Sequence, residues 1–98
     1  GIALTTAVIS SLTNKKVIII DCDMRKPRIH RLFSLSNIIG LSHILSKQAE
    51  LEECLQSSGI KNLSILTAGV IPPNPSELIS SLFVNKSRYI LLLNNNSY

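Results

Sequence analysis

The amino-acid sequence predicts an α/β domain in which a parallel β-sheet is flanked by helices. Three apolar segments, residues 17–21, 62–68 and 88–93, are expected as strands, and segments with the apolar spacing of helices separate them. The first strand carries four consecutive aliphatic residues, a pattern typical of a strand that is covered on both faces. Because parallel strands need crossover connections, the alternation of strands and helices favours a parallel sheet. Residues 17–21 and 63–67 are expected to be neighbouring or near-neighbouring parallel strands in it.

The chain before and after the first strand is expected to be helical. Residues 1–12 have mostly helical character, and the polar residues 14–16 separate them from the strand. Pro27 suits the first turn of a helix, where its missing N–H costs nothing. Apolar residues with the spacing of one buried helical face follow it: Ile29, Leu32 and Phe33. A helix is therefore predicted to begin near Pro27.

Further helices are predicted on either side of the second strand. The apolar residues after Gly40 make a short helical face, and residues 50–58 are expected to form a helix that Gly59 ends. A later helix is predicted from Pro75 to about Phe83. Its start is a capping box: Asn74 can cap, Pro75 takes the first helical position and Glu77 stands three residues after the cap.

Length and composition indicate one small globular domain. The chain has 98 residues, and 45% of them are hydrophobic. No apolar run is long enough to span a membrane and no signal peptide is recognisable, so a cytoplasmic protein is expected. Cys22 and Cys54 lack the spacing of metal ligands, which favours reduced thiols over a disulfide or a zinc site.

Positive charge is concentrated just after the first strand. The formal net charge is +4, and four basic residues lie close together: Arg25, Lys26, Arg28 and Arg31. This cluster could attract the phosphates of a nucleotide, an acidic partner or a nucleic acid, or it could simply be the solvated start of a helix. None of the four aromatic residues lies within the cluster, which argues against nucleic acid as the partner.

Two aspartates mark the end of the first strand. Asp21 and Asp23 lie at its carboxyl end, the edge where ligands bind in open α/β sheets. Residues two apart in an extended segment point the same way, so the two carboxylates would face one site and Cys22 the opposite side. They could share a cation or serve phosphate chemistry. Alternatively, Asp21 caps the turn and Asp23 begins the next helix.

Two motifs, which occur in the same order as in a known family of proteins, give the chain a resemblance to that family. The segments VIIIDCDMRKPRIHRLFSLSNIIGLSHIL and LSILTAGVIPPNPSELISS resemble the bacterial tyrosine kinases of exopolysaccharide synthesis, the BY-kinases. The resemblance covers residues 5–81. It implies a P-loop NTPase-like fold related to partition and septum-site ATPases. Residues 1–98 would then form a single, partial P-loop kinase domain that is incomplete at both ends.

The resemblance implies an ATP and Mg²⁺ site. Residues 17–25 match the Walker A′ motif, so Asp21 and Asp23 would serve the magnesium ion and help to activate the attacking tyrosine hydroxyl, with Arg25 beside them. Thr5 and Thr6 match the threonine-rich start of the helix after the P-loop and would offer hydroxyl groups to the nucleotide. The second motif is expected to act as scaffold or subunit contact rather than to touch the nucleotide.

The chain departs from the family pattern at both ends. A P-loop uses glycines, a lysine and a hydroxyl to hold phosphates, whereas GIALTTA stands here and no lysine precedes Lys15. At the position of the Walker B aspartate, the final strand ends in Asn94. The resemblance therefore predicts a piece of an ATP-dependent protein-tyrosine kinase that is inactive on its own.

The resemblance also suggests partners and alternatives. A membrane-bound polysaccharide chain-length regulator is the expected partner, which would bring the chain to the inner face of the cell membrane, and the parent family can form homo-oligomers. The chain could instead be a non-catalytic interaction module that docks with that regulator. A partition-type ATPase is a further alternative, against which the sequence PPNPSEL argues.

Overall fold

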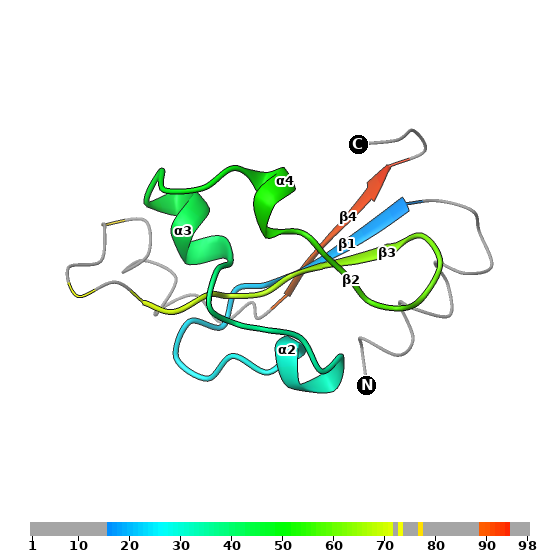
Figure 1. Cartoon of the computed structure of the whole chain (residues 1–98), viewed down its shortest axis with the longest axis horizontal. Coiled ribbons are helices and arrows are strands. Elements are labelled where there is room, and N and C mark those ends of the chain that lie inside the picture. Colours follow the sequence, from blue (N-terminus) through cyan, green and yellow to red (C-terminus); the bar gives the residue numbers. More distant parts are fainter. Residues whose placement is uncertain (1–15, 72, 74–76, 78–88, 95–98) are drawn as a thin grey trace.

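The computed structural model of the chain describes residues 16–71, 73, 77 and 89–94. Its elements, drawn in Figure 1, are β1 (Lys16–Asp21), α2 (Ile29–Leu32), α3 (Leu41–Leu45), α4 (Leu51–Cys54), β2 (Gln56–Ser57), β3 (Leu63–Leu66) and β4 (Tyr89–Asn94). The helix expected for residues 1–12 lies outside the described residues. The same is true of most of the helix expected from Pro75, of which Glu77 is described and is helical.

The described strands form one four-stranded sheet in the order β2-β3-β1-β4. β1 and β3 pair in parallel, with Ile19 opposite Ile65, which confirms the predicted pairing of these two strands. β4 runs antiparallel to β1, and β2 runs antiparallel to β3. The α/β prediction therefore holds, with the parallel pair at the centre of a mixed sheet.

Helices cover the central strands on both faces. Alternate residues of β1 enter two apolar clusters: Val17 and Ile19 pack with Ile29 of α2, while Ile18 and Ile20 pack with Cys54 of α4. In Figure 1, α2 accordingly lies on one side of the sheet, and α3 and α4 lie on the other. This arrangement explains why β1 carries a continuous aliphatic run rather than an alternating one.

The helix after Pro27 is shorter than predicted. α2 begins at Ile29, which is completely buried, and Phe33 packs against the same apolar cluster. Leu32, which was expected on the buried face, is instead 66% exposed. The reason is length: α2 has four residues, so only one turn faces the sheet and Leu32 lies on its outer side.

The helix predicted for residues 50–58 is cut short by a strand. α4 ends at Cys54, and Leu55 already has the extended angles φ −66° and ψ 133°. Gln56 and Ser57 then pair with Ile65 and Ser64 of β3. Tertiary pairing with the sheet thus overrides the local helical pattern.

All described helices are short. The longest, α3, has five residues. None of them has the length and apolar character needed to cross a membrane. Isolated helices of this size are unstable in water, so packing against the sheet must hold them in place.

Candidate functional site

The carboxyl ends of the two parallel strands meet at one edge of the sheet. Ile20 of β1 is paired with Leu66 of β3, so the segments that follow both strands start side by side. These segments are residues 22–28 and residues 67–71, on the left in Figure 1. The two motifs identified in the sequence therefore meet at this edge, which is the usual ligand edge of an α/β sheet.

Asp21 is a fully buried carboxylate that organises the segment after β1. Its Oδ1 accepts a hydrogen bond from the backbone N–H of Asp23 at 2.9 Å, and its Oδ2 accepts those of Arg28 at 3.0 Å and Ile29 at 3.1 Å. The last two donors stand at the start of α2, where backbone N–H groups have no helical partner. Asp21 thus caps α2 from seven residues away, the turn-capping alternative raised by the sequence.

Asp23 and Arg25 are more accessible. Asp23 is half-buried, and its Oδ1 accepts the backbone N–H of Lys26 at 3.0 Å. Arg25 is exposed. Solvent therefore reaches the carboxylate of Asp23, while the carboxylate of Asp21 is buried. The other two expected nucleotide-binding residues, Thr5 and Thr6, lie outside the described residues, and their role stays a prediction.

The donor set at this edge suits Mg²⁺ in part. Among the described residues, no group of three or more His, Cys, Asp or Glu side chains is placed to hold a metal ion. Magnesium, however, keeps several waters and commonly takes one or two carboxylates together with substrate phosphates. Asp23, with the buried Asp21 two residues before it, matches that type of binding and not an all-protein cage.

The second motif contacts the end of the loop between α2 and α3 and the first residues of α3. Leu41 and Ser42 donate backbone N–H groups to the carbonyl oxygens of Thr67 and Ala68, at 2.7 and 2.9 Å. The Asn37 side chain in turn accepts the backbone N–H of Gly69 at 2.9 Å. We call this contact between residues 37–42 and 67–70 the loop clasp. It joins the chain after β1 to the chain after β3.

Close packing of two glycines makes the clasp possible. A Cβ on Gly40 would overlap the carbonyl oxygen of Thr67 and lie 2.6 Å from the backbone nitrogen of Gly69. Gly69 has φ +79°, which favours glycine, and a Cβ there would lie 2.8 Å from the nitrogen of Gly40. These contacts support the expected scaffold role of the segment that begins at Gly69.

Buried polar side chains in the clasp were not predicted from the sequence. Ser42 and Thr67 are fully buried, and their hydroxyls donate to the carbonyl oxygens of Val70 (2.7 Å) and Ile39 (3.2 Å). The half-buried His43 accepts the backbone N–H of Gly40 on Nδ1 at 3.2 Å. Partners that lie 28 residues apart leave no local pattern in the sequence.

β4 brings its last residue to the far edge of the sheet. Because β4 is antiparallel to β1, Tyr89 pairs with Asp21 and Asn94 pairs with Lys16. The family resemblance aligns Asn94 with the Walker B aspartate, a position that would place it beside Asp21. The structure places it instead at the other end of β1, where it cannot join Asp21 and Asp23.

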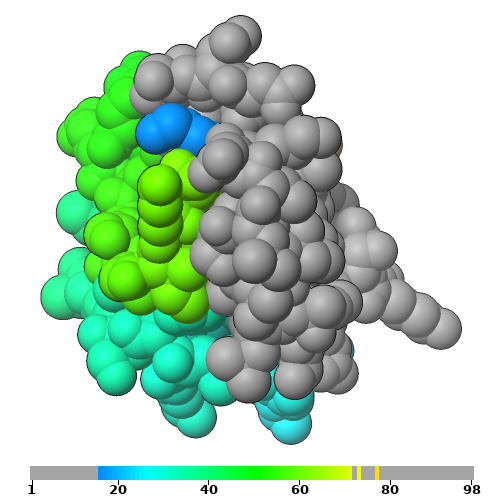
Figure 2. Space-filling model, turned by 90° about the vertical axis from the view of Figure 1, so that its right-hand side faces the viewer, coloured from blue at the N-terminus to red at the C-terminus, as the bar shows by residue number. Residues whose placement is uncertain are grey.

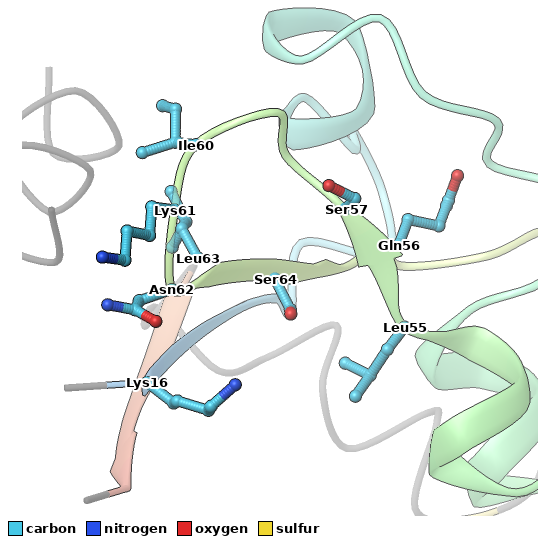
Figure 3. Close-up of a pocket in the computed structure, with 9 residues that line it drawn as sticks. All are labelled: Lys16, Leu55, Gln56, Ser57, Ile60, Lys61, Asn62, Leu63 and Ser64. Atoms are coloured by element: carbon cyan, nitrogen blue, oxygen red, sulfur yellow. The ribbon is translucent and has the colours of Figure 1, made fainter. Parts of the chain in front are cut away.

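A cavity of about 360 Å³ lies at that far edge. Its walls come from the starts of β1 and β3 and from β2: Lys16, Leu55, Gln56, Ser57, Ile60, Lys61, Asn62, Leu63 and Ser64. Figure 2 looks onto this edge, and Figure 3 shows Lys16 and Ser64 directed into a common space and Lys61 directed away from it. The length of β1, about 17 Å, separates the cavity from Asp21, so it is not part of the candidate site.

The thiols of the two cysteines are expected to react slowly. Cys22 and Cys54 are free and buried in the same apolar cluster. Burial raises the pKa of both thiols, and the charge of Asp21 raises the pKa of Cys22 further, as that of Glu53 does for Cys54. Because the thiolate is the reactive form, iodoacetamide should alkylate the native protein at least about tenfold more slowly than the urea-unfolded protein.

Mass spectrometry of samples quenched over time measures both rates. A Cys54→Ala variant assigns the remaining signal to Cys22. Native alkylation as fast as that of the unfolded chain would show that the apolar cluster is open to solvent.

Comparison with known proteins identifies the relatives of the chain. No protein-family model matches it. Over 87 residues it is 44% identical to the tyrosine-protein kinase YwqD of Bacillus subtilis (strain 168), covering 89% of this chain and 37% of that protein. The chain therefore spans little more than a third of this relative.

Solved structures give the same result. The chimerical protein CapA2B2 matches with a TM-score of 0.68 and 38% identity, over 87% of this chain and 36% of that one. The kinase domain of the Escherichia coli tyrosine kinase ETK matches with a TM-score of 0.67 and 34% identity, over 83% of this chain and 30% of that one. The chain is therefore a homologue of the bacterial tyrosine kinases, the BY-kinases, and corresponds to part of their kinase domain.

Proposed function

We propose that the chain is part of an ATP-dependent protein-tyrosine kinase that acts in exopolysaccharide or capsule synthesis and chain-length control. The observation that carries the proposal is the geometry after β1, where Asp21 fixes the segment that bears Asp23 and Arg25 through three backbone hydrogen bonds. The homology to tyrosine kinases supports the reaction, which transfers the γ-phosphoryl group of ATP to a tyrosine hydroxyl.

In this proposal the two aspartates have different tasks. Asp23 holds Mg²⁺ from the accessible side of the site, and Asp21 serves the same ion while it keeps the segment in place. The ion would neutralise charge that develops on the phosphates during transfer. Arg25, exposed two residues after Asp23, adds a positive charge for the same phosphates.

The phosphate-binding part of the site is weak in these 98 residues. Residues 1–15 contain one lysine, Lys15, directly before β1, so no lysine stands at the P-loop position of GIALTTA. Thr5 and Thr6 are proposed to contribute hydroxyl groups only. We therefore propose that this chain alone has little or no kinase activity and that a complete site requires a lysine-bearing P-loop.

An interaction module is the second candidate function. It is favoured by large apolar residues that remain exposed around the loop clasp, with exposed fractions of 69% for Ile38, 49% for Ile39 and 54% for Val70. In this version the chain docks with a membrane-bound chain-length regulator and transfers no phosphate. The two candidates differ in whether Asp23 binds a divalent ion.

Titration of the 98-residue chain with Mg-ATP is expected to show binding no tighter than the millimolar range, because Mg²⁺ relies on phosphates that GIALTTA does not hold. No tyrosine phosphorylation is expected. Isothermal calorimetry measures the affinity, and the ETK kinase domain serves as the positive control. Micromolar binding that is lost in an Asp21→Ala and Asp23→Ala double variant would show that the chain forms its own phosphate site.

A metal titration tests the proposed role of Asp23 separately. Mn²⁺, a paramagnetic substitute for Mg²⁺, should selectively broaden the backbone NMR signals of residues 22–26, and Asp23→Asn should abolish the effect. Glu52→Gln is the matched control, because it removes the same charge from an exposed carboxylate on α4, away from this edge of the sheet. Equal broadening in the wild type and in Asp23→Asn would favour the interaction module.

A further inference from the structure

The solvent side of α2 combines positive charge with an exposed apolar residue. Arg28 is the N-cap residue of α2, and Arg31 and Leu32 are the last two residues of this helix. All three are exposed, with Leu32 exposed to 66%, while Ile29, the first residue of α2, is completely buried in the apolar cluster. We call the three exposed residues the α2 outer face.

The surroundings of this face carry charge of one sign. Residues 24–40 contain no aspartate or glutamate, whereas they include the exposed Arg25 and Lys26. Among the residues that the structure describes, no ion pair is recorded for Arg28 or Arg31. The face therefore presents a positive field that no neighbouring acid in this stretch of sequence offsets.

Contacts of the backbone and of Ile29 hold α2 against the sheet and so fix the orientation of this face. The backbone N–H groups of Arg28 and Ile29 are held by the Asp21 carboxylate, and Ile29 anchors the helix on the sheet. The arginine side chains take no part in these hydrogen bonds. Substitution of the exposed side chains therefore leaves intact the contacts of Asp21 and Ile29 that hold α2 in place.

We propose that the α2 outer face docks directly on an anionic phospholipid surface. Arginine side chains near such a surface gain electrostatic attraction to lipid headgroups, and an apolar side chain between them can enter the interface. Leu32 favours a lipid surface over an acidic polypeptide or nucleic acid. A partner bound through charge alone would make no apolar contact with this exposed leucine, whereas a lipid surface offers one. This contact is independent of ATP, of Mg²⁺ and of any membrane-spanning partner.

Vesicle co-sedimentation of the 98-residue chain tests the proposal. We expect binding to vesicles that are about one-third phosphatidylserine, little binding to pure phosphatidylcholine, and a loss of binding as salt is raised. Arg28→Gln with Arg31→Gln should weaken binding at least about tenfold. Lys47→Gln with Lys61→Gln removes the same charge from two exposed residues outside α2 and should change binding only slightly.

A third variant separates lipid from other acidic partners. Leu32→Ser keeps every charge and should still weaken vesicle binding severalfold. If Leu32→Ser binds as the wild type does and soluble polyglutamate competes with the vesicles, the face recognises an acidic polypeptide and the lipid proposal is wrong. It is equally wrong if both double variants lose affinity to the same degree, or if the wild type shows no preference for phosphatidylserine.

Circular dichroism of each variant checks that it is folded. Should the double arginine variant fail to fold, Arg31→Gln alone, on the exposed side of α2, is expected to weaken binding about threefold or more. An Arg31→Gln variant that is folded and binds normally would also overturn the proposal.

Discussion

Replacement of Asp21 by alanine is expected to lower the free energy of unfolding by about 3 kcal/mol. The change removes the acceptor of three backbone N–H groups, those of Asp23, Arg28 and Ile29. The N–H of Ile29 is buried and would lose its partner without gaining water. Loss of the cap on α2 adds to the cost. Urea denaturation followed by circular dichroism measures the difference.

Asp23→Ala is the matched control. Asp23 is also an aspartate of the same motif, but the hydrogen bond that its carboxylate accepts from the N–H of Lys26 is exposed. Its replacement should cost less than about 1 kcal/mol, because water can satisfy the freed donor. If Asp21→Ala is too unstable to purify, Asp21→Asn, which keeps one carbonyl oxygen, should give an intermediate loss. Equal losses for Asp21→Ala and Asp23→Ala would contradict the capping role.

The different roles of Asp21 and Asp23 show which features could be predicted from the sequence and which could not. The aliphatic run before Asp21 was enough to predict a strand that is buried on both faces, and the helices between the runs were enough to predict its parallel pairing with β3. The sequence left open whether the carboxylates bind a cation or cap a turn. The structure gives Asp21 a capping role, while cation binding at the pair stays a proposal.

Strand direction and short strands were harder to predict. Residues 88–93 were expected as a strand and β4 covers Tyr89–Asn94, but an apolar run does not reveal whether it pairs parallel or antiparallel. β2 is the two polar residues Gln56 and Ser57, which carry no strand signal of their own. Both features depend on which neighbour in the sheet is free to pair, and that information lies outside the local sequence.

The loop clasp was missed for a related reason. Its hydrogen bonds join residues 37–42 to residues 67–70. Each of them uses at least one backbone group, which every sequence supplies, and three also use a side chain, that of Asn37, Ser42 or Thr67. The only local sign was glycine at positions 40 and 69. A glycine indicates either a turn or a close approach, and the sequence cannot tell which of the two it is.

Gly40→Ala is expected to destabilise the protein by about 3 kcal/mol or more, because the new Cβ would overlap the backbone of the strand-end segment that begins at Thr67. The obstacle includes the carbonyl oxygen of Thr67 and the nitrogen of Gly69, 2.6 Å away, and backbone atoms cannot swing aside as a side chain can. The clasp would have to open, which would expose the buried Ser42 and Thr67. Thermal and urea unfolding measure the loss.

Gly59→Ala is the matched glycine control for this prediction. Gly59 has φ +84°, so alanine there is strained, but no atom lies within 4 Å of the added Cβ. Its cost should be about 1 kcal/mol, from backbone conformation alone. Since Gly40 does not have a positive φ, the excess loss of stability in Gly40→Ala over Gly59→Ala measures the steric overlap within the clasp.

Hydrogen exchange gives a second readout. Gly40→Ala should deprotect the amides of Leu41 and Ser42, which donate to Thr67 and Ala68, while the amides of β1 stay protected. Protection of Leu41 and Ser42 at the wild-type level would mean that the two loops accommodate the methyl group and that the clasp is not closely packed.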